Sequence, residues 1–243
     1  MQRTSLAQLQ EHGAVINRYG FNSRGADYAV ASLSRFRSEQ VAGKVRSAGL
    51  VAVNIGKNKT AEDAVADYCV GVQRLGGLAD AIVVNISSPN TPGLRSLQVR
   101  ASSAAGHACS VAGGWHISQC STLPRWYLQC AAQGRKELEG LVRRVRAARD
   151  AMAWGEQGPP PLLVKIAPDL SREDQEDIAA VVSRASVDGL VVSNTTVTRP
   201  ESIRSHPAAQ EAGGLSGECL NSKELVLVLI CWFAQRPECP PHT

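Results

Sequence analysis

The sequence has no apolar run long enough to cross a membrane. Its longest run, Leu225 to Ala234, has ten residues, whereas a membrane-spanning helix needs about 20. The first residues also lack the apolar core of a secretory signal and the Arg- and Ser-rich amphipathic pattern of an organelle-targeting segment. We therefore expect neither a membrane span nor a targeting segment in this chain.

Signals for metal, disulfide and nucleic-acid binding are also missing. None of the seven cysteines forms a C-x-x-C pair, and the five histidines share no ligand spacing, so we expect no metal site. Without a secretory signal, a disulfide framework is not expected in a chain of this length. The 26 basic and 22 acidic residues give a net charge of +4 with no Lys/Arg block, which argues against a nucleic-acid partner.

Two segments differ in composition from the rest of the chain. Residues 99–133 contain no Asp or Glu but three Cys and two of the four Trp, and they show no helical or strand period. A long lid would be uncommon in a compact domain, so we favour translated non-coding sequence and expect disorder. Residues 218–243, with three more Cys, are interpreted as an unrelated tail. The predicted barrel domain is thus divided into residues 1–98 and 134–217.

Strands and helices alternate in the remaining sequence. Apolar runs of strand length lie at 50–55, 81–85, 162–166 and 189–193. Helices are predicted from a capping box at Thr60–Asp63 to about Leu75, from Arg135 to Met152, and from a capping box at Ser171–Asp174 to about Ala185. Continuously apolar strands separated by helices indicate a parallel sheet with both faces covered. The predicted fold class is α/β, a partial (β/α)8 TIM barrel with roughly half of the strands. A doubly wound fold is disfavoured, because no G-x-G-x-x-G or Walker A motif follows a strand.

Polar side chains occur at the end of every predicted strand. They are Asn54, Asn85 followed by Ser88 and Asn90, Lys165, and Ser193-Asn194-Thr195. The carboxyl ends of the strands carry the active site in (β/α)8 barrels, so these residues are candidate ligands of a flat polar molecule. Taken alone, Asn54 and the segment after Asn85 are also compatible with turn chemistry, and Lys165 with an ordinary salt bridge.

The order of several short motifs resembles that of the dihydroorotate dehydrogenases, flavoenzymes of pyrimidine synthesis. The segment Asn85-Ile86-Ser87-Ser88-Pro89-Asn90-Thr91 is similar to their catalytic loop. The other matching motifs are Asn17-Arg18-Tyr19-Gly20-Phe21-Asn22, Val53–Lys59, Val164–Asp169, Ser193–Thr196 and Gly213–Gly217, the last of which resembles a glycine-rich loop near the cofactor phosphate.

The resemblance implies a role for each matching residue. Ser88 is the implied catalytic base. The implied substrate contacts are Asn17, Arg18, Tyr19, Gly20, Phe21, Asn85, Asn90, Asn194 and Thr195, and the implied FMN contacts are Asn54, Asn85, Lys165, Ser193 and Gly217. The implied reaction is FMN-dependent oxidation of dihydroorotate to orotate. Ser rather than Cys at the base position is typical of the class that uses quinone, which in eukaryotes is bound peripherally to the mitochondrial inner membrane.

The chain also departs from the family pattern. Neither the family's membrane-associating helical region nor its first barrel strands precede Ala14, and its phosphate-binding last strands do not follow Gly217. We therefore expect impaired or absent activity. Two interpretations remain: a quinone-type enzyme in incomplete or mis-spliced form, and a non-catalytic fragment or splice product of the same family. A soluble Cys-type enzyme is disfavoured by Ser88.

Overall fold

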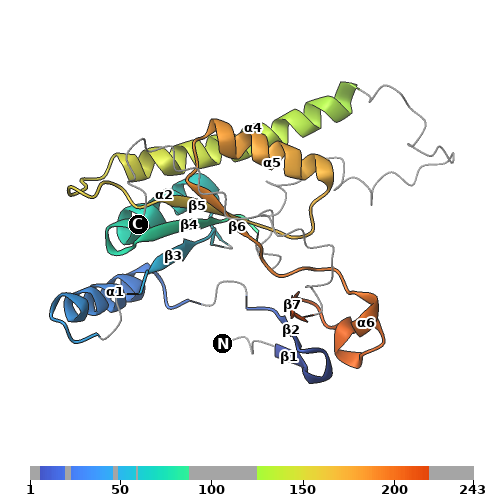
Figure 1. The fold of residues 1–243 in the computed structure, drawn as a ribbon. Coiled ribbons are helices and arrows are strands. Elements are labelled where there is room, and N and C mark those ends of the chain that lie inside the picture. Colours follow the sequence, from blue (N-terminus) through green and yellow to red (C-terminus); the bar gives the residue numbers. More distant parts are fainter. Residues whose placement is uncertain (1–5, 20–22, 46–48, 59, 88–124, 219–243) are drawn as a thin grey trace, which may run out of the picture.

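The larger of two sheets is parallel and follows the order of the sequence (Figure 1). The structure is a computed structural model, which describes residues 6–19, 23–45, 49–58, 60–87 and 125–218. The four strands of this sheet are β3 (Ala52–Ile55), β4 (Ala81–Asn85), β5 (Leu162–Ile166) and β6 (Gly189–Val192). Each strand pairs with the next in parallel, which confirms the predicted parallel βα arrangement.

Helices cover one face of this sheet. The helices are α1 (Ala26–Val41), α2 (Ala64–Leu75), α4 (Arg125–Asp150), α5 (Arg172–Arg184) and the short α6 (Glu201–Arg204), with 3-10 turns η1 (Gln10–His12), η2 (Gly76–Leu78) and η6 (Pro207–Gln210). In Figure 1, α4 and α5 run across one side of the sheet. No helix of the described residues is long and apolar enough to span a membrane.

The hydrophobic core lies between these helices and alternate residues of the strands. Val84 of β4 and Val164 of β5 are buried against Tyr68 of α2, Val145 of α4 and Val181 of α5. Because side chains alternate along a strand, the residues between the core positions point to the opposite face. Helices α1, α2, α4 and α5 pack on the core face, and on the opposite face Val83 and Asn85 are also buried.

Several element boundaries differ from the sequence prediction. The cap of α2 is Asp63 rather than Thr60, because the Asp63 carboxylate accepts hydrogen bonds from the N–H groups of the first helical turn. Helix α4 begins at Arg125, ten residues before the predicted start. Strand β3 is shorter than predicted and only partly buried, because it is the edge of the described sheet. The capping box of Ser171 with Asp174 is confirmed.

The sequence did not predict a second, antiparallel sheet. It consists of β1 (Leu6–Leu9), β2 (Ala14–Asn17) and β7 (Gly214–Gly217), with β2 in the centre. Gly213–Gly217 was predicted as a loop, but its last four residues form β7. A Cβ at Gly217 would lie 2.4 Å from Gly13 O, and its φ of 138° is one that other residues rarely adopt. Close pairing with β2 therefore explains this glycine.

Asp80 links the amino end of β4 to Val51, which precedes β3, and to Arg37 of α1. Its N–H donates to Val51 O at 2.8 Å, and its carboxylate accepts from Val51 N at 2.7 Å. Arg37 of α1 pairs with the same carboxylate at 2.8 Å. Burial opposes ionisation of Asp80, but the hydrogen bonds from Val51 and Arg37 outweigh it and hold the pKa of this carboxyl below its usual value.

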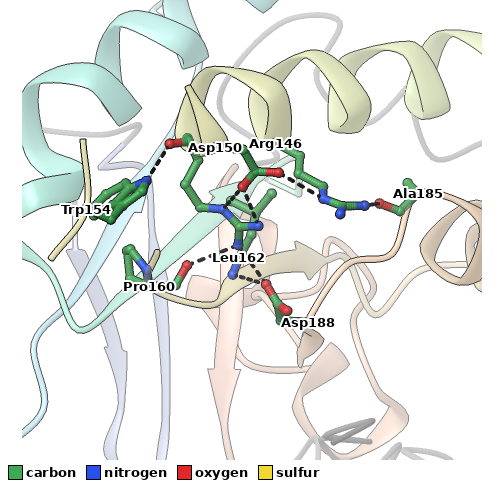
Figure 2. Close-up of polar contacts among 8 residues, drawn as sticks. Arg146, Asp150, Trp154, Pro160, Leu162, Ala185 and Asp188 are labelled. Carbon is green, nitrogen blue, oxygen red and sulfur yellow. Dashed lines mark hydrogen bonds and ion pairs between the residues drawn. The ribbon is translucent and has the colours of Figure 1, made fainter. Parts of the chain in front are cut away.

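Asp188 makes the equivalent contacts at the amino end of β6 (Figure 2). Its N–H donates to Leu162 O at 3.0 Å and its carboxylate accepts from Leu162 N at 2.7 Å. Arg149 of α4, which is 5% exposed, donates to Asp188 at 2.8 Å and to Pro160 O at 3.0 Å, and also pairs with Asp150. These contacts lie opposite the carboxyl ends, where a (β/α)8 barrel places residues that stabilise it.

We predict that Arg149→Met lowers the free energy of unfolding by about 1–3 kcal/mol, because Asp188 and Pro160 O lose a buried donor. The matched control is Arg172→Met, which removes an ion pair with Glu176 from an arginine side chain that is 88% exposed. Its expected effect is below about 0.5 kcal/mol. Urea unfolding of both variants measures the difference, and equal losses would contradict the structural role of Arg149.

Candidate active site at the carboxyl ends of the parallel strands

Polar side chains from three neighbouring strands gather at one end of the parallel sheet. Asn85 of β4 and Lys165 of β5 are register partners, so their side chains share the face that no described helix covers. Asn194 follows β6, and its N–H donates to Ile166 O of β5 at 3.0 Å. Asn54 of β3 lies on the same face and is exposed. The structure thus brings together three of the residues that the sequence placed at strand ends, Asn85, Lys165 and Asn194.

The Ser87 hydroxyl joins two of these amide side chains. Ser87 Oγ lies 2.8 Å from Asn85 Oδ1 and 2.8 Å from Asn194 Nδ2. The Ser87 N–H donates to the same Asn85 oxygen at 3.1 Å, while Asn194 Oδ1 accepts from Thr195 N at 2.8 Å. Ser87 is fully buried and Asn85 is 3% exposed. A buried hydrogen-bond network therefore links the ends of β4 and β6.

Tyr68 of α2 holds the end of β4 from the helix side. Its hydroxyl donates to Asn85 O at 2.8 Å, and its side chain is fully buried. Burial raises the pKa of the Tyr68 phenol well above its ordinary value, although a hydrogen bond from the backbone of Lys57 lowers it. The phenol is therefore neutral at physiological pH and remains a donor to Asn85 O.

Lys165 of β5 carries a positive charge on the same face of the sheet as Asn85. Its side chain is half-buried, and the resulting desolvation lowers the pKa of the ammonium from its ordinary value. Among the described residues the Lys165 ammonium has no ion pair or hydrogen bond, so the described part of the chain does not support an ordinary salt bridge as its role. A partly desolvated cation beside Asn85 is suited to bind negative charge on a ligand.

The segment after β6 is fixed by contacts with two other segments. Ser193 Oγ donates to Asn194 O at 3.2 Å. Thr196 donates its hydroxyl proton to Asp169 in the segment after β5, and Val197 N donates to the other Asp169 oxygen at 3.0 Å. Thr196 also pairs with Leu215 of β7 through two backbone hydrogen bonds. Asn194 and Thr195 therefore lie on a segment held at both sides.

The small sheet places part of the first predicted motif near this segment. Strand β2 pairs with β7, and β7 pairs with Thr196; with strands about 4.8 Å apart, β2 lies roughly 10 Å from Thr196. Asn17 ends β2 and accepts from Tyr19 N at 3.4 Å, whereas Arg18 pairs with Glu211 at 3.3 Å. Tyr19 is 47% exposed. Gly20 and Phe21 lie outside the described residues.

A sequence model of the family described as dihydroorotate dehydrogenase matches residues 3–238 of this chain. The chain belongs to the dihydroorotate dehydrogenase family. The mitochondrial quinone enzyme of Oryza sativa subsp. japonica is 46% identical over 229 residues, covering 88% of this chain and 41% of that enzyme. The mitochondrial quinone enzyme of Mus musculus is 41% identical over 218 residues, covering 90% of this chain and 45% of that enzyme.

A solved structure of the same family has the same fold. The ligand-free dihydroorotate dehydrogenase of Eimeria tenella aligns with a TM-score of 0.70 and 33% identity, over 90% of this chain and 54% of that one. This likeness and the parallel βα units confirm the predicted fold class, a partial barrel of the dihydroorotate dehydrogenase type. The chain spans about half the length of the curated relatives it matches.

Some residues to which the dehydrogenase resemblance assigns roles remain predictions. Ser88, the implied base, and Asn90 lie outside the described residues. Gly217 is described, but its backbone pairs with β2, so its role as a cofactor contact stays a prediction. No group of three or more His, Cys, Asp or Glu side chains that could hold a metal ion occurs in the described ranges.

Sequence reasoning missed two residues of this candidate site, Ser87 and Tyr68. A signal for Ser87 was available, because strand alternation puts residues 85 and 87 on the same side of the chain. Tyr68 carried no comparable signal. Its position on the apolar side of α2 predicts a core residue, and only the folded chain shows its hydroxyl at Asn85 O.

We predict that Tyr68→Phe lowers the free energy of unfolding by about 1–2 kcal/mol at neutral pH, because Asn85 O loses its buried donor. The raised pKa of Tyr68 in the folded state means that its stabilising effect is complete below the unfolded pKa of about 10 and is lost as the pH rises above it. The difference between parent and variant should therefore narrow above about pH 10. Urea unfolding between pH 7 and 10.5 measures this, and a constant difference would contradict it.

Proposed function

We propose that the site at the carboxyl ends of β4, β5 and β6 supports FMN-dependent oxidation of dihydroorotate to orotate. One observation carries this proposal: in a chain of the dihydroorotate dehydrogenase family, the Asn85–Ser87–Asn194 network lies beside Lys165 on the face that no described helix covers. Amide donors beside a cation suit a planar ligand with carbonyl and carboxylate oxygens.

The residues of this face fit FMN. The Lys165 ammonium has no ion-pair partner in the described ranges and is partly desolvated. Negative charge on a flavin ring would therefore stabilise the charged form of this ammonium. Asn54, Asn85 and Ser193 are the other proposed contacts, and each lies at or next to a strand end. FMN, when bound, would accept the hydride from C6 of dihydroorotate and pass its electrons to quinone.

The chain's own residues would bind the substrate and move one proton. Asn85 and Asn194 would hold the substrate through hydrogen bonds, with Asn17, Thr195 and Asn90 as further proposed contacts. Ser88, which follows the buried Ser87, would remove the C5 proton. A serine hydroxyl is a weak base in water, so this step requires a closed site in which the charge that develops is stabilised by hydrogen bonds.

The acceptor and location follow from the relatives. The enzymes of Oryza sativa and Mus musculus are named as mitochondrial quinone enzymes, and we infer quinone as the acceptor here as well. For a eukaryotic source we propose peripheral association with the mitochondrial inner membrane. The chain spans about half of these relatives' length, so the activity and acceptor of the whole enzymes are proposals for this chain.

We predict that the purified chain, with FMN in excess, shows at most slow anaerobic bleaching of the flavin by dihydroorotate, in keeping with the impaired activity expected from the sequence. Ser88→Ala should slow this reduction about 10²–10⁴-fold while FMN binding is retained. Ser183→Ala, an exposed position on α5, is the control and should reduce flavin at the parental rate. Flavin binding without any reduction in the parent would instead favour a non-catalytic member of the family.

We predict that Lys165→Met weakens FMN binding without lowering the stability of the ligand-free chain, because it removes a partly desolvated cation. The pKa of Lys165 is lower in the folded chain than in the unfolded chain. The free energy of unfolding of the parent therefore increases as the pH rises toward the pKa of an unfolded lysine, and the variant should lack this increase. Lys136→Met, at an exposed position of α4, is the control. Flavin fluorescence and urea unfolding measure both effects, and FMN binding equal to that of the parent would refute the assignment of Lys165.

A further inference from the structure

Two backbone N–H groups determine which atoms of the Asn85–Ser87–Asn194 network donate. A backbone N–H can only donate. The Ser87 N–H bonds Asn85 Oδ1 at 3.1 Å, and the Thr195 N–H bonds Asn194 Oδ1 at 2.8 Å. The orientation of both amide groups follows, with the oxygens bound to the backbone and the NH₂ groups directed elsewhere.

The direction of the two hydrogen bonds between Ser87 Oγ and the asparagine side chains then follows. Asn194 Nδ2 lies 2.8 Å from Ser87 Oγ and can only donate to it. Asn85 Oδ1 can only accept, so the Ser87 hydroxyl donates to that oxygen, also at 2.8 Å. The chain of donation runs from Asn194 through Ser87 to Asn85, across the ends of two different strands.

This direction fixes what the site offers to a ligand. Asn85 Nδ2 has no hydrogen-bond partner in the described ranges, and Asn194 Nδ2 has one proton left after its bond to Ser87. Every fully buried side-chain nitrogen or oxygen of the described residues has a hydrogen-bond partner. Because Asn85 Nδ2 has no such partner, this atom is not fully buried and is accessible to a ligand. Both amides therefore present donors, beside the Lys165 cation.

We propose that Ser87 is a positioning residue that orients Asn85 and Asn194 so that both present N–H donors to a ligand with carbonyl and carboxylate oxygens. The link to the ligand rests on the proposed function, whereas the orienting effect does not depend on any ligand. Ser87 acts through its buried hydroxyl on the two amides, and contact with the ligand is made by the asparagines.

The first test uses the 243-residue chain without ligand. Side-chain amide resonances of Asn85 and Asn194, assigned by ¹⁵N NMR, report proton exchange at each NH₂ group. Ser87→Ala should accelerate exchange of the Asn194 amide about tenfold, in line with the loss of one hydrogen bond, and the exposed-site control Ser183→Ala should not. Unchanged exchange in Ser87→Ala would overturn the orienting role.

A second variant keeps the test decisive if Ser87→Ala fails to fold. Asn85→Asp retains an oxygen that accepts from Ser87 N and Ser87 Oγ, so protection of the Asn194 amide should remain. The same change converts the ligand-facing NH₂ into an acceptor, so orotate binding should be lost. Loss of Asn194 protection in Asn85→Asp would show that the donation does not run in the proposed direction.

The second test titrates orotate and FMN separately into parent and Ser87→Ala. We expect orotate affinity to fall about tenfold and FMN affinity to fall less, because orotate depends on both amides whereas FMN has proposed contacts with Lys165, Asn54 and Ser193 besides Asn85. A merely destabilised fold would weaken both equally. Unchanged orotate affinity, with faster amide exchange, would overturn the link to the ligand. A parent chain that does not bind orotate would refute the proposed function, and the exchange measurement would still decide whether Ser87 orients the two amides.

Discussion

The parallel pairing of β4 with β5 and of β5 with β6 is the constraint on which the site depends. Register pairing places Asn85 beside Lys165, and the segment after β6 returns to β5 through the bond from Asn194 N to Ile166 O. Strand alternation then separates two environments, with Val84 and Val164 in the core and Asn85 and Lys165 on the other face. A shift of one residue in the pairing of β4 with β5 would put Asn85 and Lys165 on opposite faces of the sheet.

Contacts at the two ends of this sheet serve different purposes. At the amino ends, Asp80 and Asp188 each bind a backbone N–H at the start of the neighbouring strand and an arginine from a helix. Both carboxylates are therefore occupied by contacts within the protein. At the carboxyl ends, Asn85 and Lys165 keep polar hydrogens without partners in the described ranges. This difference agrees with stabilisation at one end of a barrel and ligand binding at the other.

The strands of the parallel sheet were predictable because each is a short apolar run between breakers, and β4 and β5 match the prediction residue for residue. The antiparallel sheet was not predictable, because Gln8 interrupts the apolar pattern of β1 and β7 contains two glycines. Helix α1 was missed for a related reason: Gly25 before it offers no capping side chain, and none of its residues is fully buried. In both cases tertiary contacts rather than local pattern decide the structure.

The meeting of Asn85, Lys165 and Asn194 followed from the rule that parallel strands end together, so the sequence was sufficient for that part of the site. The hydrogen bonds through Ser87 and Tyr68 were not, since they depend on side-chain positions from different elements. The segment with Ser88 and Asn90 lies outside the described residues, and its assignment still rests on the family resemblance.

The most direct test of the central claim is a crystal structure of the full chain with FMN and orotate bound. We expect orotate oxygens within hydrogen-bond distance of Asn85 Nδ2 and Asn194 Nδ2, with Lys165 against the flavin and Ser87 still bridging the two amides. Orotate bound elsewhere, or contacts made through the amide oxygens, would contradict the account.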